Sequence, residues 1–496
     1  MAQTTAQDRA FFGHPRGLST LFFTEMWERF SYYGMRALLL LYMTAPLSAG
    51  GLGFDAAQGG AIYALYTSMV YLATLPGGWI ADRLIGPRRG VLIGGMFIAA
   101  GHFSMASALL PMFYLGLFLI VIGTGLLKGN VSVIVGKLYT AGDNRRDAGF
   151  SIFYMGINLG AFIAPIICGY LGQEINWHLG FAMAGIGMTI GLIQYSLGAS
   201  RLGDAGVAPA PATESERAAW KRQATIAIGV LIALALIVGV GGYTGLVPIT
   251  ARQVSDAAGV FLLVVIIGFF GWLYSSSDWT PDERKRLYVI GVLFFAASLF
   301  WSVFEQAGST LNLFADRNTH NNFLGYDFPS SWYQSINSMF LIIFAPIMAW
   351  LWVRMSTRGN EPSSPMKFAW GLLLVGLGFV ILIPPAQASG QLASPMWLTA
   401  TYFLHTIGEL CLSPVGLSAM TILAPPRIGG LMMGIWFLAT SVGNFIGGRV
   451  SGLYESFALP TLFGAVGGFA IAAGVILMIA APAMRKLMPA QISKAA

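Results

Sequence analysis

Charged residues are scarce in this sequence. Asp, Glu, Lys and Arg together make up 10% of its 496 residues, whereas hydrophobic residues make up 56%. A soluble domain carries about 25% charged residues, so this composition excludes an ordinary soluble globular protein. The apolar runs are long enough to cross a bilayer, which takes about 20 residues each. The sequence therefore predicts a membrane protein with many spans.

Cysteine and histidine are scarce as well. The two cysteines, Cys168 and Cys411, both fall in apolar runs, where we expect unpaired small packing residues. His405 and Glu409 have i,i+4 spacing, but the sequence has no HExxH motif and no further ligand cluster, so we expect no metal and no cofactor. The first residues are polar and lack the apolar region of a cleavable signal peptide.

The apolar runs predict about fourteen helices. Their approximate cores are 19–43, 59–82, 90–110, 112–136, 149–171, 178–199, 223–242, 258–275, 288–312, 331–353, 367–384, 395–421, 429–453 and 461–483.

Basic residues alternate between the two sets of connections. One set holds most of the Arg and Lys residues and includes both termini, whereas the opposite set holds only Arg252, Arg317 and Arg449. The positive-inside rule places the basic side in the cytoplasm. We therefore expect a plasma (inner) membrane protein with both termini cytoplasmic. This location explains the net charge of +7 without nucleic-acid binding.

The segment 200–222 is rich in Ala, Pro and charge and is the clearest linker. It divides six helices from the rest, and six more follow the pair 223–242 and 258–275. We predict three parts: a six-helix bundle (1–199), a cytoplasmic linker with an inserted helix pair (200–286) and a second six-helix bundle (287–496). Two such bundles indicate the major facilitator fold with a central site between the halves. The cores of the inserted pair contain no charge, so we expect a lipid-facing hairpin outside the pathway.

Seven charged residues fall inside the apolar spans. They are Glu25, Glu28, Arg29 and Arg36 in the first span, Lys128 in the fourth, and Glu305 and Glu409 in later ones. A charge at membrane depth costs roughly 2.5–3.5 kcal/mol on insertion scales. A chain that keeps seven of them indicates a polar pathway, and hence a transporter.

The charges of the first span lie on one helix face. At 100° per residue they fall, together with Tyr32 and Tyr33, within an arc of about 140°. Two acids beside one arginine can hold a proton at modest cost, as a proton-coupling group must. The alternative is a buried ion-pair network that only fixes packing.

The intramembrane cations all lie in the N-terminal half, whereas Glu305 and Glu409 lie in the C-terminal half. A cavity polarised in this way fits a zwitterion such as a short peptide, whose ammonium faces the acids and whose carboxylate faces Arg or Lys. For Lys128 the alternative is a fixed structural counter-ion. Tyr71, Trp301 and Trp436 lie in spans near the charges. Their side chains combine apolar surface with one polar group, which suits the binding of varied peptide side chains. The alternative is that they only pack the protein core.

Two strings carry a family resemblance. Residues 77–89, GGWIADRLIGPRR, resemble the loop 2–3 motif of the major facilitator superfamily, and residues 25–34, EMWERFSYYG, resemble the ExxERFxYYG signature of the proton-dependent oligopeptide transporter (POT) family. Residues 153–161, FYMGINLGA, are similar to the second signature of that family. The resemblance covers essentially the whole chain. It implies a symporter for di- and tripeptides driven by the inward proton gradient, and not an enzyme.

The resemblance also implies site residues. It assigns proton coupling to Glu25, Glu28, Arg29 and Glu305; peptide binding to Tyr32, Tyr33, Arg36, Tyr71, Lys128, Asn158, Asn337, Glu409 and Trp436; gating to Arg36, Lys128, Glu305 and Glu409; and a conformational role to Gly78, Asp82, Arg83, Arg88 and Arg89. Within this scheme Asn337 and Glu409 receive the peptide ammonium, and Arg36 and Lys128 receive its carboxylate.

The sequence departs from the mammalian members of the family at one point. These carry a proton-linked His in the second span just after a Tyr, whereas here Tyr63 is followed by Ala64. Coupling must then rest on carboxylates. A carrier of the same fold for another solute, such as a peptide-like drug, nitrate or another small metabolite, is the leading alternative. Nothing in the sequence requires an oligomer, and we expect a monomer in the lipid bilayer.

Overall fold

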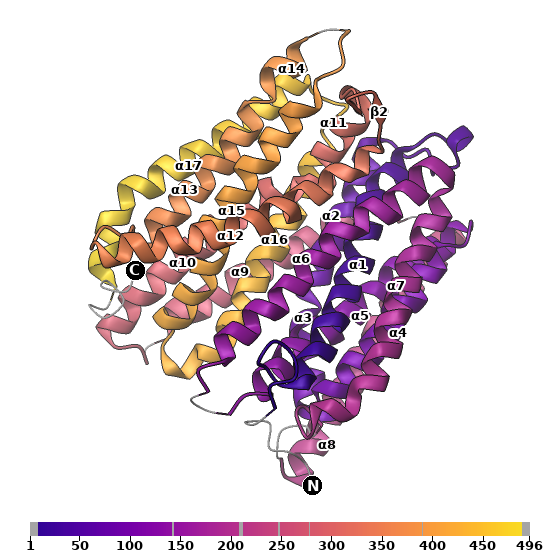
Figure 1. The fold of residues 1–496 in the computed structure, drawn as a ribbon. Helices are drawn as coiled ribbons and strands as arrows, with labels where there is room; N and C mark the ends of the chain where they lie inside the picture. Colours follow the sequence, from indigo (N-terminus) through magenta and orange to yellow (C-terminus); the bar gives the residue numbers. More distant parts are fainter. Residues whose placement is uncertain are drawn as a thin grey trace. The chain divides into compact units, whose positions relative to one another are not determined.

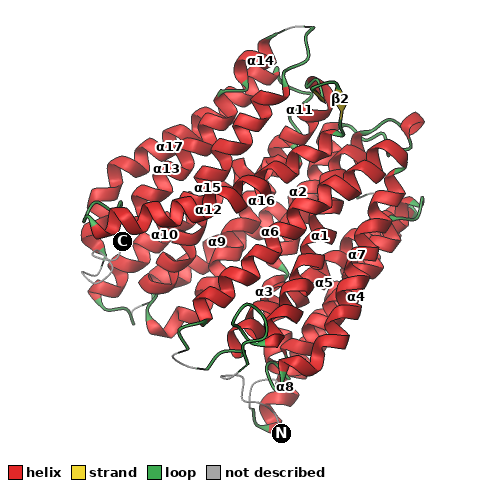
Figure 2. Cartoon of the chain, in the orientation of Figure 1, coloured by secondary structure: helices red, strands yellow, loops and turns green. Residues whose placement is uncertain are grey.

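The computed structural model describes residues 8–140, 143–207, 212–246, 249–276, 278–388 and 390–488. The chain is almost entirely helical, with short connections and a single two-stranded hairpin in the described residues (Figure 2). Parts of the expected linker (208–211) and both predicted cytoplasmic ends (1–7 and 489–496) lie outside the described residues.

The helices group into two compact units. Unit 1 comprises the chain up to Leu39 and the segment Met69–Thr250, and unit 2 comprises the remainder. Each unit is described separately below, with the element labels of Figure 1.

Unit 1 contains most of α1 and the end of α2, followed by a run of helices. Their bounds are α1 (Arg16–Thr44), α2 (Ala56–Leu72), α3 (Thr74–Ile80), the π-helical turn η2 (Ala81–Ile85), α4 (Pro87–Met105), α5 (Leu110–Lys137), α6 (Arg146–Tyr170), the π-helical turn η3 (Leu171–Ile175), α7 (Trp177–Gly198), the 3-10 turn η4 (Ala199–Leu202) and α8 (Glu214–Tyr243).

Unit 2 contains the loop between α1 and α2, most of α2 and the second half of the chain. Its elements are η1 (Leu47–Ala49), α9 (Ala251–Ser275), α10 (Pro281–Phe304), the 3-10 turn η5 (Glu305–Gly308), α11 (Thr310–Asn318), β1 (Asn322–Phe323), β2 (Tyr326–Asp327), η6 (Ser330–Trp332), α12 (Tyr333–Thr357), α13 (Ser364–Val380), α14 (Ile383–Gln387), α15 (Pro395–Leu423), η7 (Pro426–Leu431), α16 (Met432–Ser451) and α17 (Leu459–Leu487).

Every expected span lies mainly on helical residues, which confirms the prediction of an all-α polytopic membrane protein, although the span 90–110 extends beyond the end of α4 at Met105. Within the described residues, nine helices are long and apolar enough to cross a membrane. Three expected spans are interrupted: 59–82 at Ala73, 288–312 at the 3-10 turn that starts with Glu305, and 367–384 between α13 and α14.

The inserted helix pair is longer than its apolar cores. α8 begins at Glu214 behind a Thr213 cap and includes charged residues in its first turns, and α9 includes Asp256, which pairs with Arg449 of α16 at 2.9 Å. The two helices fall in different units, α8 in unit 1 and α9 in unit 2. The domain boundaries at 199 and 286 stay predictions.

Helices within each unit approach closely at paired glycines. A Cβ on Gly94 of α4 would lie 2.5 Å from the Gly123 carbonyl oxygen of α5, and the reverse distance is also 2.5 Å. In unit 2, Gly376 of α13 and Gly467 of α17 form the same kind of pair at 2.7 Å, where the two helices run side by side (Figure 1). Lipid gives no hydrophobic drive for helix association, so this close van der Waals contact is a main source of packing energy.

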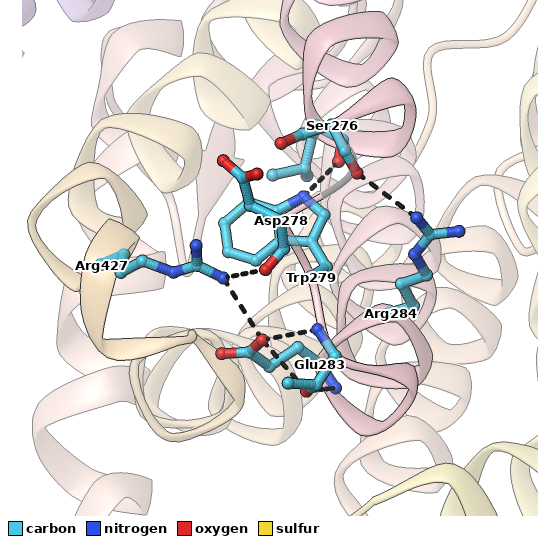
Figure 3. A network of polar contacts seen from close by, with 8 residues as sticks. Ser276, Asp278, Trp279, Glu283, Arg284 and Arg427 are labelled. Carbon is cyan, nitrogen blue, oxygen red and sulfur yellow. Dashed lines mark hydrogen bonds and ion pairs between the residues drawn. The ribbon is translucent and has the colours of Figure 1, made fainter.

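A polar network fixes the corner between α9 and α10 (Figure 3). The Arg427 guanidinium lies 4.4 Å from the centre of the Trp279 ring, donates to the Asp278 carbonyl at 2.7 Å and approaches Glu283 at 3.4 Å. Trp279 donates from Nε1 to the Leu273 carbonyl at 2.8 Å. Because Arg427 belongs to η7, the connection between α15 and α16 is anchored on this corner.

We predict that Gly123→Leu destabilises the protein strongly, since its side chain must displace the α4 backbone. Overpacking of this kind costs typically about 1–3 kcal/mol or more. Gly229→Leu in α8 is the matched control, because nothing lies within 4 Å of a Cβ at Gly229. Thermal unfolding in detergent measures both variants. A Gly123→Leu protein with the melting temperature of the control contradicts the packing argument.

Candidate functional site

The α1 charges form a closed cluster in unit 1. The exposed fractions of Glu25, Glu28 and Arg29 are 3%, 0% and 3%. Arg29 Nε lies 3.2 Å from Glu25 Oε1 and also pairs with Glu28. Two carboxylates thus share one guanidinium, so the three side chains carry one net negative charge when all are ionised. Binding one proton would neutralise the cluster.

Some hydrogen-bonding capacity of this cluster is unused. One oxygen of Glu25, one oxygen of Glu28 and Nη2 of Arg29 are buried without a hydrogen-bond partner in the described part of the chain. A buried polar atom left in this way costs about 1–3 kcal/mol. The functional role of the cluster and the alternative of an ion-pair network that only fixes packing both stay predictions.

The predicted cations of unit 1 each lie against a tyrosine ring. Arg29 is 5.2 Å from the Tyr32 ring centre and Arg36 is 5.8 Å from that of Tyr33. The Lys128 ammonium from α5 is 3.7 Å from the ring centre of Tyr71 in α2. Such cation–π contacts help to fix the positions of the three cations.

Asn158 of α6 is buried, but its amide donates to the Tyr154 carbonyl of its own helix at 3.0 Å. Peptide binding by Asn158 therefore stays a prediction. The same signature contains a glycine with a packing role that sequence reasoning missed. A Cβ on Gly160 would lie 2.2 Å from the Met26 carbonyl of α1, so this glycine lets α6 approach the charged helix.

In unit 2 the predicted ammonium site is assembled from two helices. The Asn337 amide of α12 donates to Glu409 Oε2 of α15 at 3.2 Å and to the Thr406 hydroxyl at 3.0 Å. Glu409 is only 8% exposed. Thr406, one helical turn before Glu409, was not among the predicted residues. In the sequence, only its position three residues before Glu409, on the same face of the helix, could have indicated that Thr406 belongs to this site.

Glu305 occupies the point where α10 ends and a 3-10 turn begins. It is buried, and its charge interacts with that of Glu409.

Trp301 and Trp436 pack edge to face with their ring centres 6.5 Å apart. A Cβ on Gly416 would lie 2.4 Å from the Trp436 ring, so this tryptophan also fills a core position.

His405 takes part in packing. Its Nε2 lies 3.1 Å from the Val375 carbonyl, which requires a proton on Nε2, and its ring stacks on Phe379 at 5.7 Å. Among the described residues, no group of three His, Cys, Asp or Glu is placed to hold a metal ion.

The predicted conformational motif is docked on the segment that follows α7. The Arg88 side chain donates to the Gly203 carbonyl at 2.7 Å, and its backbone N–H donates to the Gly206 carbonyl at 3.0 Å. Gly86 has a φ of +83°, and a Cβ there would lie 2.4 Å from the Val207 carbonyl. The turn therefore needs glycine at position 86, which the motif prediction omitted.

Arg83 lies between two tryptophans. Its guanidinium is 5.7 Å from the Trp79 ring centre and 4.7 Å from that of Trp220 in α8.

The remaining motif residues differ in their surroundings. Asp82 and Arg89 are exposed. A Cβ on Gly78 would meet open space, whereas one on Gly77 would lie 2.1 Å from the Gly125 carbonyl. Within this structure Gly77 is thus the packing glycine, and the role of Gly78 stays a prediction.

The comparison with known families decides the classification. A model described as the POT family matches residues 88–466, which is more than half of the chain. This chain belongs to the POT family.

Three relatives match nearly end to end. The Uncharacterized transporter YclF of Bacillus subtilis (strain 168) is 44% identical over 97% of this chain and 96% of its own length. The Peptide transporter YePEPT of Yersinia enterocolitica is 39% identical over 98% of this chain and 97% of its own length. A Di-/tripeptide transporter of Lactococcus lactis subsp. cremoris is 38% identical, with 98% and 99% covered.

Solved POT structures share the whole fold. A crystal structure of peptide transporter POT in complex with sulfate has a TM-score of 0.91 and 42% identity, and covers 98% of this chain and 99% of its own. A mutant of that transporter in complex with alafosfalin has a TM-score of 0.89 at the same identity and coverage. The predicted major facilitator fold of the POT family is thereby confirmed.

We predict that Trp220→Ala loosens the Arg83 turn. A cation–π contact at an exposed site contributes about 0.5–1 kcal/mol, so amide hydrogen exchange over residues 80–89 should rise about two- to fivefold. Trp272→Ala, at a half-exposed position of α9, is the matched control. Equal exchange in the two variants would show that Trp220 does not hold this turn.

Proposed function

We propose that this member of the POT family is a proton-coupled symporter that imports di- and tripeptides. Its relatives include proteins named as peptide and di-/tripeptide transporters at 38–39% identity over almost the whole chain. The observation that carries proton coupling is the buried α1 cluster, in which two carboxylates share a single arginine. The transported species are a peptide and protons, and the protein performs no covalent chemistry on the peptide.

The peptide ends are recognised by opposite charges. Glu409, oriented by the hydrogen bond from Asn337, receives the ammonium, because a carboxylate has two oxygens and can accept several hydrogen bonds. Arg36 and Lys128 receive the carboxylate. Asn158 binds the peptide backbone. The aromatic side chains Tyr32, Tyr33, Tyr71 and Trp436 line the pockets for varied peptide side chains.

Protons bind at the Glu25–Glu28–Arg29 cluster and at Glu305. The burial of these groups makes the neutral and charged states differ strongly in free energy, so a change in protonation can shift a conformational equilibrium. Glu305 lies where α10 passes into a 3-10 turn, and such a stretch within a span often marks a functional hinge. In this scheme Arg36, Lys128, Glu305 and Glu409 act as gating residues during alternating access.

The protein works as a monomer in the inner membrane with both termini in the cytoplasm. The support is the concentration of Arg and Lys in alternate connections. The motif residues Gly78, Asp82, Arg83, Arg88 and Arg89 govern conformational change and do not bind peptide. The docking of Arg83 and Arg88 on neighbouring segments of unit 1 supports such a role.

Uptake of labelled dialanine into proteoliposomes tests the function. With an inward proton gradient we expect accumulation above the external concentration. A protonophore should abolish this accumulation. One net charge moving across 100 mV corresponds to about 2.3 kcal/mol, or about a fiftyfold concentration ratio. Absence of uptake by folded, inserted protein would contradict peptide transport.

We predict that Glu305→Gln separates exchange from accumulation. The variant keeps the side-chain size but cannot bind or release a proton, so it should still exchange peptide across the membrane yet fail to concentrate it. Glu214→Gln, at the exposed start of α8, is the matched control and should accumulate peptide normally. Accumulation at the wild-type level in Glu305→Gln would remove this residue from the coupling role.

A further inference from the structure

The inserted helix α9 contacts the rest of unit 2 along a single stripe. Its buried side chains are Ser255, Leu262, Phe270 and Leu273. At 100° per residue these positions and Gly259 fall within an arc of about 80° on the helix. The preceding helix α8 exposes nearly all of its described side chains. The sequence predicts a lipid-facing hairpin for both helices, but α9 is supported by protein along most of its length.

Near its start, α9 is joined to the last turns of α16. Asp256 Oδ1 lies 2.9 Å from Arg449 Nη2. One turn further along α9, a Cβ on Gly259 would lie 2.7 Å from the ring of Phe445, so glycine lets this ring lie directly against the α9 backbone. Phe445 is itself one turn from Arg449. The ion pair and the ring contact therefore form one patch between the two helices.

Near the end of α9, a second set of contacts holds the other end of α16. Arg427 belongs to η7, which leads directly into α16. Its guanidinium lies against the Trp279 ring and donates to the Asp278 carbonyl, both just beyond the end of α9 (Figure 3). Trp279 in turn donates to the Leu273 carbonyl in the last turn of α9. α16 is thus anchored on α9 before its first turn and again in its last turns.

α16 carries Trp436 on the face opposite to its α9 contacts. At 100° per residue, Phe445 lies about 180° and Arg449 about 220° around the helix from Trp436. The Trp436 side packs on α10, since a Cβ on Gly443 or Gly447 would lie 2.8 or 2.7 Å from an α10 carbonyl oxygen. α16 is therefore held between α10 on one side and α9 on the other. A displacement of α16 relative to α9 must also displace Trp436.

We propose that α9 positions the peptide site: Asp256, Gly259 and Arg427 hold α16, and with it Trp436, in the place where the peptide binds. Because Trp436 is assigned to peptide binding in the proposed function, this role rests on that function. The three residues act through α16 and are positioning residues. A binding side chain held in place by its surroundings loses less conformational freedom when the ligand binds, which raises affinity.

The apparent KM for dialanine exchange in proteoliposomes, measured without a proton gradient, tests the ion pair. Arg449→Gln should raise this KM about two- to fivefold, as expected for loss of an exposed ion pair, and leave the maximal rate and the melting temperature close to wild type. The charge swap Asp256→Arg, Arg449→Asp should restore the KM. Lys285→Gln is the matched control, because it removes an ion pair with Asp282 that lies within α10.

Gly259→Leu tests the ring contact. Its side chain must push Phe445 and α16 away from α9, so the KM should rise about tenfold. Gly268→Leu on the same helix is the matched control, because no described atom lies within 4 Å of a Cβ at Gly268. Amide hydrogen exchange over residues 432–451 should rise about two- to fivefold in Arg449→Gln and Gly259→Leu and stay at the wild-type level in both controls. This second measurement needs no transport.

A wild-type KM and wild-type hydrogen exchange of α16 in both variants overturn the proposal. Equal effects in the controls overturn it too, because the α9–α16 contacts would then not be the cause. A charge swap that leaves the KM raised removes the ion pair from the positioning role. If the wild-type protein does not exchange dialanine, the peptide assignment fails, whereas hydrogen exchange still shows whether α9 supports α16. Arg449→Gln keeps the test decisive should Gly259→Leu fold poorly.

Discussion

The cost of keeping charge inside a membrane is the constraint on which this protein depends. Glu25, Glu28 and Arg29 are almost completely buried in one helix, and the single guanidinium balances only one of the two carboxylates. In the function proposed above, this surplus charge is relieved when a proton binds and restored when it leaves. Under that proposal, each proton transfer changes the free energy of the helix that carries the cluster and so biases a conformational equilibrium.

Close helix packing makes this arrangement possible. Glycine pairs such as Gly94 with Gly123 bring backbones together, and Gly160 brings α6 against the charged helix α1. Packing of this kind excludes water from the charges, which strengthens their electrostatic interaction. The contact of Arg83 with Trp220 then fixes a connection between helices in unit 1. The contacts of Arg427 with the α9–α10 corner do the same in unit 2 (Figure 3).

The helices could be predicted from the sequence because hydropathy is a local property, and the spans and the α1 charge face followed from it. The POT signature supplied the candidate residues. What could not be predicted depends on contacts between distant segments. The break of α10 at Glu305 and the contact of Arg83 with Trp220 have no local signal in the sequence. The i−3 spacing of Thr406 and Glu409 placed both on one helix face but did not show that Asn337 donates to both of them. The apolar cores of the inserted pair likewise gave no sign of the Asp256–Arg449 contact.

The central claim is that peptide and protons cross the membrane together. The most direct test is to measure proton entry when peptide is added. Dialanine is added outside proteoliposomes that contain a trapped pH dye and start with no pH gradient, under an inside-negative potential. The account predicts that the lumen acidifies when peptide is added and that acidification stops in Glu305→Gln, while peptide exchange continues. Peptide entry with no change in lumenal pH in the wild-type protein would contradict the account.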